Sequence, residues 1–461
     1  MAILKKETVE PLSSAMRGTV IGADDARYDS WRAVYNGMID KRPALIARCV
    51  DVADVISAVK FAREHDLAVA VRCGGHNGGG LGTVDDGMVI DLSLMRGVRI
   101  SPTERTVQVE GGAKLGDLDH ATHAFGMAVP GGIISTTGVG GLTLGGGLGH
   151  LTRGLGLTID NLLAVDMVLA DGSFVTASAK QNDDLFWAVR GGGGNFGVVT
   201  NFTFRAHPVS TVIAGPTLWE MDEAADVMKF YREFITSAPK ELGGFFMFLT
   251  IPPGPPFPEA LHLKKMCGIA WTYTGSAKDA DRVLKPVRDF KPMAMDGVMP
   301  LPMPGWNSAF DALYPPGHQQ YWKADFVNEL SDKAIDQHLK HAAQLPTMQS
   351  CMHLYPIDGA AAEVSNSDTA WAYRKAKWAE VIFAVDPDPA KAGLLKKWAT
   401  DYWEAVHPYS AGGAYVNFMM DEGQERVQAT YRDNYRRLAS IKKKYDPTNF
   451  FHVNQNIRPA T

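Results

Sequence analysis

A histidine inside a glycine loop is the first residue in this sequence whose surroundings suggest chemistry. His76 lies in Gly74-Gly75-His76-Asn77, which Arg72 and Cys73 connect to the apolar run 68–71. Backbone N–H groups approach a phosphate closely only where no Cβ intervenes, so a glycine loop at the end of a strand suits a diphosphate. Further glycine clusters occur at 131–149 and 191–197. A single cluster is as typical of a turn as of a binding loop, but three together favour a bound dinucleotide.

The placement of these loops argues against a Rossmann fold, although strings resembling GxGxxG occur in them. A Rossmann fingerprint lies between the first strand and its helix. The first predicted strand is 44–47, and its helix begins after Asp51, a candidate N-cap, with no glycine in between. The glycine loop follows the second predicted strand instead. The sequence therefore predicts a different dinucleotide-binding fold.

Composition excludes several classes of function. The chain has 461 residues and a net charge of -5 without a long basic run, which argues against a nucleic-acid partner. No apolar stretch is long enough to span a bilayer, and the first 14 residues lack the apolar segment of a secretory signal. The four cysteines and the histidines have no metal-ligand spacing, so neither a metal site nor a disulfide framework is expected. A reduced, cytoplasmic setting is the default expectation.

The chain divides by composition into three parts. Residues 1–207 contain the glycine clusters and several short predicted strands. In residues 208–414, proline-rich connectors separate longer apolar strands from amphipathic helices, which is typical of an antiparallel sheet flanked by helices. Residues 415–461 contain a predicted helix at about 425–444 and a polar tail. We therefore expect an α+β protein with a separate sheet domain in the middle of the chain.

Several ordered segments resemble the berberine-bridge-enzyme-like oxidases of the vanillyl-alcohol-oxidase superfamily. The string 71–77 resembles their flavin-attachment motif, and similar segments follow at 138–141, 184–192 and 195–199. Near the end, Tyr415-Val416-Asn417 and 454–457 continue the likeness, which is weakest in the middle domain. The family implies an FAD-binding domain of the PCMH type made of two parts, residues 1–207 and the return 415–461. Residues 208–414 would then form an inserted substrate-binding domain.

The resemblance also implies how FAD is held. It implies a covalent bond between the imidazole of His76 and the flavin 8α-methyl group, whereas the alternative interpretation of His76 is an ordinary polar loop residue. Some members form a second bond through a cysteine, but Ile134 occupies that position here, so a single bond is expected. The residues expected to contact the cofactor are Arg72, Cys73, Gly74, Gly75, His76, Asn77, Gly138, Gly140, Gly141, Leu144, Gly147, Gly149, Asn195, Gly197, Val199, Asn454 and Asn456.

Three residues are candidates for catalysis. Hydride transfer to flavin N5 usually needs a base that removes a proton from a neighbouring O–H or N–H group. Tyr415 matches a family position over the flavin, as base or as orienting group, and the alternative is a core tyrosine. His353 lies in the predicted strand 350–356, where relatives often place a carboxylate, and it is as readily a sheet histidine. Thr137 replaces a usually small apolar residue near the oxygen-reactive face, where it either steers O2 or caps the loop.

Aromatic side chains are candidates for the walls of the substrate pocket. Trp371 and Tyr373 replace a family pattern near the pocket, and Phe246, Trp322 and the methionine-rich stretch 295–303 could add apolar walls. Aromatic residues at alternate strand positions are more often core. Such a pocket would favour a flat, aromatic or apolar molecule over a bare sugar.

Together these features predict an FAD-dependent oxidoreductase acting on a small aromatic or apolar alcohol or amine. The expected acceptor is O2, which yields H2O2. A flavin-dependent oxygenase, or a dehydrogenase with another acceptor, is the alternative within the same fold. A flavoprotein that binds without turnover is a third interpretation, and the completeness of the flavin motifs argues against it. The oligomeric state and the identity of the substrate are left open.

Overall fold

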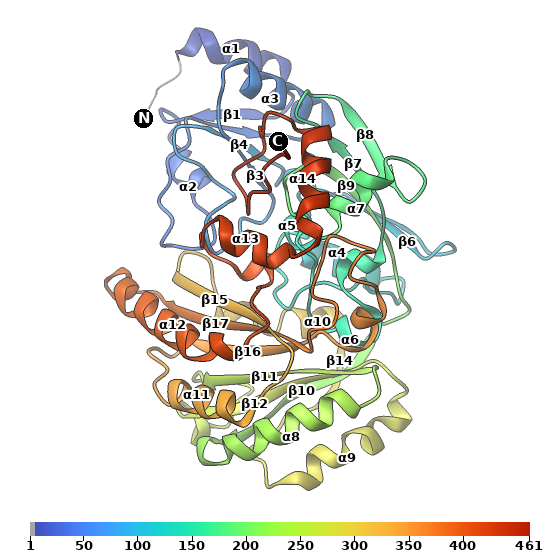
Figure 1. Cartoon of the computed structure of the whole chain (residues 1–461), viewed down its shortest axis with the longest axis vertical. Helices are drawn as coiled ribbons and strands as arrows, with labels where there is room; N and C mark the ends of the chain where they lie inside the picture. The colour runs from blue at the N-terminus through green and yellow to red at the C-terminus, as the bar shows by residue number, and fades with distance from the viewer. Residues whose placement is uncertain (1–4) are drawn as a thin grey trace.

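The computed structural model describes residues 5–461 and contains three β-sheets, arranged in two halves of an elongated molecule (Figure 1). One half holds the two smaller sheets and the last helices of the chain, and the other holds the largest sheet with its helices. No helix among these residues is long and apolar enough to cross a membrane. No group of three or more His, Cys, Asp or Glu side chains within 5–461 is placed to hold a metal ion.

The first sheet has the strand order β1-β2-β4-β3. Strands β2, β4 and β3 run parallel, and β1 pairs antiparallel with β2. Asp51 caps α3 by accepting hydrogen bonds from the N–H groups of Ala53 and Asp54 (3.0 and 3.1 Å), so the predicted N-cap is confirmed. The elements here are α1 (Lys6–Ala15), β1 (Thr19–Gly22), α2 (Tyr28–Arg32), β2 (Leu45–Arg48), α3 (Val52–Glu64), β3 (Val69–Arg72) and β4 (Met88–Asp91).

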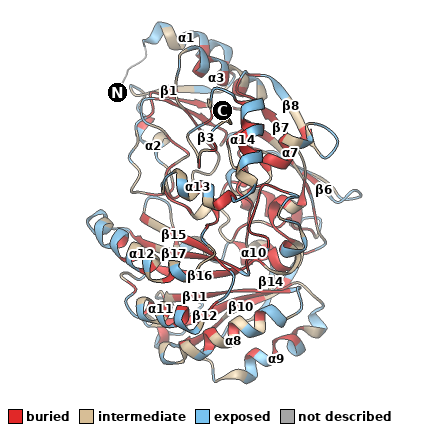
Figure 2. Ribbon diagram, viewed as in Figure 1, coloured by how far each residue is buried: buried red, intermediate tan, exposed pale blue. Residues whose placement is uncertain are grey.

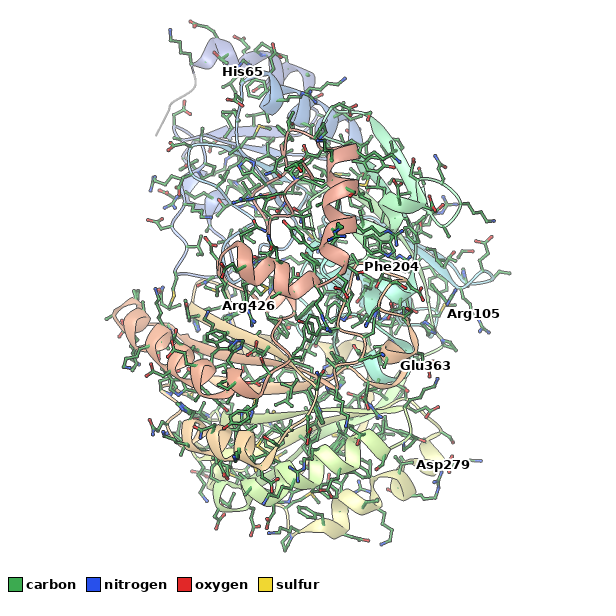
Figure 3. All side chains as sticks on the ribbon, in the orientation of Figure 1. His65, Arg105, Phe204, Asp279, Glu363 and Arg426 are labelled. Atoms are coloured by element: carbon green, nitrogen blue, oxygen red, sulfur yellow. The ribbon has the colours of Figure 1, made fainter. Side chains whose placement is uncertain are left out.

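The second sheet is antiparallel and has the order β5-β6-β9-β7-β8. Its strands are β5 (Val98–Ser101), β6 (Thr106–Glu110), β7 (Leu162–Val168), β8 (Phe174–Ser178) and β9 (Val198–Arg205). The helices of this region are α4 (Leu115–His123), α5 (Val139–Leu144), α6 (Thr152–Leu155) and α7 (Asp183–Val189). Phe202 and Phe204 of β9 are fully buried in the core between this sheet and the helices. The label of Phe204 in Figure 3 marks this core.

The third sheet is antiparallel and has the order β13-β10-β12-β11-β16-β17-β15, with β14 pairing on β10. Its strands are β10 (Thr211–Glu220), β11 (Leu242–Thr250), β12 (Lys265–Tyr273), β13 (Met295–Asp296), β14 (Met299–Pro302), β15 (Gln319–Val327), β16 (Cys351–Pro356) and β17 (Trp378–Asp386). All of them lie within the range 208–414 that the sequence assigns to a separate domain. The mixed helix and sheet architecture agrees with the predicted α+β class.

Four long helices cover one face of the third sheet: α8 (Ala224–Ser237), α9 (Ala280–Phe290), α11 (Asp332–Ala342) and α12 (Ala392–Val406). The short helix α10 (Met303–Asn307) lies at the edge strand of this sheet. Figure 2 shows the strands buried and the outer sides of these helices exposed. The opposite face of the sheet packs against residues of the glycine-rich half, including Leu148 and Tyr415. The functional site must therefore be sought on that second face.

The C-terminal segment returns to the first half of the molecule. The predicted single helix at 425–444 is wrong: α13 (Gln424–Tyr431) and α14 (Asn434–Tyr445) are separated at Arg432, whose φ of 47° breaks the helix. Lys442, fully buried, pairs with Asp446 (2.6 Å) and donates to the carbonyls of Asn195 and Phe451 (2.6 and 2.9 Å). This cluster fixes the last helix to the third glycine loop.

Arg426 of α13 joins this return to the third sheet (Figure 3). Its guanidinium donates to the carbonyl of Ala324 on β15 (2.6 Å) and pairs with the buried Asp325. It also donates to the carbonyl of Gly412 (2.9 Å). The two halves of the molecule are therefore held by charged groups as well as by apolar packing.

Candidate active site

A cavity of about 310 Å³ lies where the glycine loops face the uncovered side of the third sheet. Its walls come from all three predicted parts of the chain. Of the residues predicted to contact the cofactor, those that line it are Arg72, Cys73, Gly74, Gly75, His76, Asn77, Gly138, Gly140, Gly141, Leu144, Gly197, Val199 and Asn454. Its volume is at the lower end of the range for cofactor and ligand sites.

The backbone around the cavity has the form that a dinucleotide requires. A Cβ on Gly74 would lie 2.5 Å from the nitrogen of Gly138, so the first two glycine loops touch backbone to backbone. A Cβ on Gly141 or Gly194 would meet nothing within 4 Å, so these two glycines leave their side of the backbone open, and both line the cavity. Open backbone of this kind lets N–H groups reach a diphosphate. The residues present fit FAD, and the glycine loops would hold its diphosphate.

Four residues predicted to contact the cofactor do not line the cavity: Gly147, Gly149, Asn195 and Asn456. The side chain of Asn195 is used within the protein, donating to Gly192 and Gln455 and accepting from the N–H of Ile457 (2.8, 3.1 and 2.9 Å). A Cβ on Gly149 would lie 2.2 Å from the carbonyl oxygen of Gly131, so this glycine permits close packing between loops. These residues position the loops rather than touch the cavity.

His76 is held by three neighbours. Its imidazole stacks on the ring of Tyr35, with centroids 3.8 Å apart and planes 17° apart. The hydroxyl oxygen of Thr136 lies 3.0 Å from Nε2, and that of Thr137 lies 3.4 Å from Nδ1. Burial lowers the pKa of His76 to about 3, and the charge of Lys114 adds to this shift. The imidazole is therefore neutral near pH 7, and the hydroxyl of Thr137 is engaged with it.

Tyr415 lines the cavity from the return segment and is buried. Its hydroxyl oxygen accepts hydrogen bonds from the N–H of Gly147 (2.9 Å) and from Nδ2 of Asn417 (2.7 Å). Burial raises the pKa of Tyr415 to about 12. The hydroxyl is therefore protonated at neutral pH and retains its own hydrogen for donation into the cavity.

His353 and Tyr355 line the cavity from strand β16. Residues of a strand alternate between its faces, so Met352 and Leu354 pack against the helices while His353 and Tyr355 face the cavity. The hydroxyl oxygen of Tyr355 lies 2.8 Å from Nδ1 of His353. Burial lowers the pKa of His353 to about 3 and raises the pKa of Tyr355 well above its ordinary value. The pair forms a neutral hydrogen-bonding unit at neutral pH.

Of the four residues predicted to contact the substrate, Trp322 lines the cavity and the other three do not. Phe246 points to the opposite face of β11 and is buried among the helices, so this prediction is wrong. The prediction that the methionine-rich stretch 295–303 forms a wall of the pocket is also wrong, because β13 and β14 lie at the far edge of the third sheet.

Trp371 and Tyr373 lie behind the cavity wall rather than in it. Trp371 packs against Tyr415, with ring centroids 5.0 Å apart. Tyr373 stacks on Phe326 and donates to the carbonyl of Ala429 (2.9 Å). Both predictions of substrate contact are therefore corrected to supporting positions. The neighbouring Arg374 is buried in a pair with Asp160 (2.7 and 2.8 Å).

His150 also lies outside the cavity, although the sequence places it directly after the second glycine cluster. Its ring is buried against Trp306, with centroids 4.8 Å apart, and Nδ1 lies 3.4 Å from the hydroxyl oxygen of Thr272. Burial lowers the pKa of His150 to about 3. It is a neutral core histidine.

Seven aromatic residues that line the cavity were not predicted from the sequence: Tyr35, Phe202, Tyr314, Tyr355, Phe383, Phe418 and Phe451. Tyr355 had a usable signal, because it lies two residues from His353 and must share its face of the strand. Tyr35 and Tyr314 come from loops that carry no recognisable motif. Their place depends on how distant segments meet.

The cavity carries almost no formal charge. Among the described residues that line it, Arg72 alone has a permanently charged side chain, and its guanidinium is bound to Asp91, with Nε donating over 3.1 Å. His76 and His353 are neutral at pH 7 because burial lowers the pKa of each to about 3. A charged substrate on the side of the third sheet, away from the N–H groups of the glycine loops, would find no ion-pair partner among these residues.

Comparison with known proteins identifies the family. An FAD-binding domain family matches residues 43–178, and a family described as berberine and berberine-like matches residues 414–458. An FAD-linked oxidoreductase of Dictyostelium discoideum is 31% identical over 425 residues, which cover 90% of this chain and 89% of that protein. The chain belongs to the berberine-bridge-enzyme-like FAD-linked oxidoreductases.

Other members of this family extend the comparison. A glucooligosaccharide oxidase of Sarocladium strictum is 27% identical over 478 residues, covering 95% of this chain and 91% of that protein. The crystal structure of 6-hydroxy-D-nicotine oxidase from Arthrobacter nicotinovorans superposes with a TM-score of 0.87 at 25% identity, covering 98% and 99% of the two chains. The predicted family and fold are confirmed. The protein is an FAD-linked oxidoreductase with a PCMH-type FAD-binding domain.

Proposed function

We propose that this protein is an FAD-dependent oxidase that holds its flavin through a single covalent bond to His76 and oxidises an uncharged, small aromatic or apolar alcohol or amine. This proposal rests on one observation: the residues that would hold the flavin and the residues that would act on the substrate line the same cavity. His76 and the glycine loops line it on one side, and His353, Tyr355 and Tyr415 line it on the other. When bound, FAD accepts a hydride at N5 and passes electrons to O2, which yields H2O2.

Two side chains have hydrogen-bonding states that suit such an oxidation. Tyr415 accepts two hydrogen bonds and keeps its own hydrogen, so it donates to the oxygen or nitrogen of the substrate and orients it. Nδ1 of His353 is occupied by Tyr355, whereas Nε2 has no hydrogen-bond partner within residues 5–461 and accepts the proton of the substrate O–H or N–H group. We therefore assign Tyr415 as orienting donor and His353 as proton acceptor.

The lining of the cavity supports the substrate class. An ion without a partner is costly to bury, so a substrate carrying a carboxylate or ammonium group would bind poorly beside this uncharged wall. Trp322, Phe383 and Phe418 provide ring surfaces, and His353 and Tyr415 offer hydrogen bonds beside them. A sugar, with hydroxyls around its whole ring, would leave most of them unpaired. The lining therefore favours an aromatic or apolar molecule with one hydroxyl or amine.

The first experiment tests the attachment of the flavin. We expect the wild-type protein to remain yellow after acid precipitation and washing, whereas His76→Ala releases its flavin into the supernatant. A wild-type precipitate without flavin would contradict the covalent bond but not the oxidase activity.

The second experiment tests the reaction. Under anaerobic conditions, matched benzylic alcohols and amines, neutral and carboxylate-bearing, are compared with glucose and cello-oligosaccharides by bleaching of the flavin absorbance. We expect bleaching with neutral aromatic members, followed by rapid reoxidation in air with one H2O2 per flavin. Bleaching only by sugars would contradict the substrate class. Slow reoxidation in air would favour a dehydrogenase with another acceptor.

A further inference from the structure

Tyr35 joins three distant segments around the flavin-attachment loop. Its N–H donates to the carbonyl of Gly75 (3.1 Å), next to His76. Its hydroxyl donates to the carbonyl of Tyr314, and its own carbonyl accepts from the N–H of Gly317 (2.9 Å). The ring is therefore fixed at its backbone and at its hydroxyl end, and it cannot rotate away from the imidazole that it covers.

The adjacent residue strengthens this clamp. Nδ2 of Asn36, which is fully buried, donates to the carbonyls of Gly78 and Gln320 (2.7 and 2.9 Å). Its Oδ1 accepts from the N–H of Gln320 (3.1 Å). Segment 35–36 thus binds the attachment loop on one side and the start of β15 on the other. Its rigidity is independent of any bound cofactor.

The ring of His76 is constrained in rotation as well as in tilt. Tyr35 covers one face of the ring and leaves its edge, where the in-plane lone pairs of the two nitrogens lie, to the neighbouring residues. Thr137, beside Nδ1, lines the cavity, whereas Thr136, beside Nε2, does not. When the Thr136 oxygen accepts the hydrogen of Nε2, the imidazole is in the tautomer whose lone pair is on Nδ1, where the hydroxyl oxygen of Thr137 lies 3.4 Å away.

We propose that Tyr35 is a positioning residue for covalent attachment of FAD, holding the imidazole of His76 so that Nδ1 faces the 8α-methyl group, while Thr136 selects the reactive tautomer. This inference rests on the proposed covalent bond. Covalent attachment gains from a nucleophile held in a reactive orientation before its partner arrives. The catalytic turnover of the loaded enzyme does not need this clamp, because the finished bond holds the ring.

One C–N bond forms between Nδ1 and the 8α carbon, and one C–H bond of the methyl group breaks. The methyl hydrogen and the hydrogen of Nε2 leave as protons, and the two electrons of the broken C–H bond pass to the flavin ring. Dioxygen takes up those two electrons and two protons and becomes hydrogen peroxide.

The experiment measures attachment rather than turnover. Protein is produced in riboflavin-limited cells and mixed in air with FAD, and the acid-stable flavin is followed with time at several FAD concentrations. The dissociation constant of FAD and the limiting attachment rate are obtained separately. A structural role of Tyr35 would change the dissociation constant, whereas a positioning role changes the limiting rate.

We expect Tyr35→Leu to lower the limiting rate by at least about tenfold with little change in the FAD dissociation constant. Tyr35→Phe keeps the stacked ring and should stay within about threefold of wild type. Tyr373→Leu is the matched control, because Tyr373 also stacks on an aromatic ring and donates to a carbonyl but lies outside the cavity. It should attach FAD at the wild-type rate.

A second variant, at Thr136, tests the same inference if Tyr35→Leu does not fold. Thr136→Val is nearly isosteric and removes the acceptor for Nε2, so we expect attachment about fivefold slower, with Thr136→Ser close to wild type. Attachment at wild-type rate in Tyr35→Leu, or in Thr136→Val where Tyr35→Leu does not fold, would overturn the proposal. A wild-type protein whose flavin is fully released by acid would instead contradict the proposed covalent bond itself.

Discussion

Replacing Tyr415 by phenylalanine isolates the hydrogen bonds that hold this side chain at the cavity. In the variant, Asn417 keeps its bond to the carbonyl of Leu142 (3.0 Å), but the buried N–H of Gly147 loses the hydroxyl that accepts it. A buried donor left unpaired costs about 1–3 kcal/mol, and the lost bond to Asn417 about 1 kcal/mol more. We therefore expect the free energy of unfolding to fall by about 2–4 kcal/mol.

Urea unfolding followed by tryptophan fluorescence, at equal flavin content, measures this change. Asn417→Ala and the double variant complete a cycle, and we expect a coupling energy of about 1 kcal/mol between Tyr415 and Asn417. The loss of the bond to Leu142 is common to both backgrounds and cancels. A change below about 0.5 kcal/mol in Tyr415→Phe, together with additive effects, would refute the hydrogen-bonding scheme.

The same variant tests the role assigned to the hydroxyl. Loss of the donor to the substrate should slow anaerobic flavin reduction by about 10- to 100-fold, the equivalent of one hydrogen bond to a reacting group. The spectrum and the covalent attachment of the flavin should be unchanged. An unaltered reduction rate beside the expected loss of stability would assign Tyr415 a structural role only.

Three further predictions concern titration and buried charge. Because burial lowers the pKa of His353 to about 3, the rate of flavin reduction by an alcohol substrate should be independent of pH between 5 and 8. The substitution His353→Asn should slow this reduction by about 100-fold or more. A change of the rate with pH centred near 6.5 in stopped-flow measurements would contradict the prediction. For His150, His338 and His353, the folded pKa of about 3 lies below the unfolded value of 6.5, so their contribution is present above pH 6.5 and lost as the pH falls. Asp119, with its pKa raised to about 7, has the opposite effect. The net loss of stability from these four groups between pH 7 and 5 should be about 3 kcal/mol in urea unfolding, and greater stability at pH 5 would refute this balance. Arg374→Met leaves the buried carboxylate of Asp160 unpaired. We expect the free energy of unfolding to fall by about 3–5 kcal/mol and the melting temperature to fall with it. An unchanged melting curve would show that the pair is not formed.

The cofactor half was accessible from the sequence because its signals are local. A glycine loop must follow its strand directly, and the order of loops along the chain distinguishes this fold from a Rossmann fold. The N-cap at Asp51 and the strand that leads to His76 are equally local. These features depend on short segments whose backbone conformation is set by their own residues.

The substrate half was harder to predict from the sequence, because polar and apolar residues alternate only weakly along its strands. In Phe245-Phe246-Met247-Phe248 every residue is large and apolar, so the pattern does not indicate which side faces the cavity. The structure places Phe246 and Phe248 among the helices and Phe245 and Met247 on the opposite face. Packing on both sides of the sheet removes the contrast between polar and apolar positions.

Long-range contacts were not predictable at all from local pattern. Tyr35 covers His76 only because residues about 280 positions further along the chain fix its hydroxyl and its carbonyl. Trp371 and Tyr373 look like pocket residues by composition, but they support Tyr415 and the junction with α13 instead. The break between α13 and α14 at Arg432 was likewise not predictable, because no glycine or proline in the sequence indicates it.

The buried pair of Lys442 and Asp446 has a consequence for biosynthesis. It holds the last helix to the third glycine loop, and Tyr415, Asn454 and Gln455 complete the wall of the cavity. The pocket can therefore close around a ligand only after the chain has left the ribosome as far as residue 455. A chain that ended within the sheet domain would leave the glycine loops without these three residues of the cavity wall.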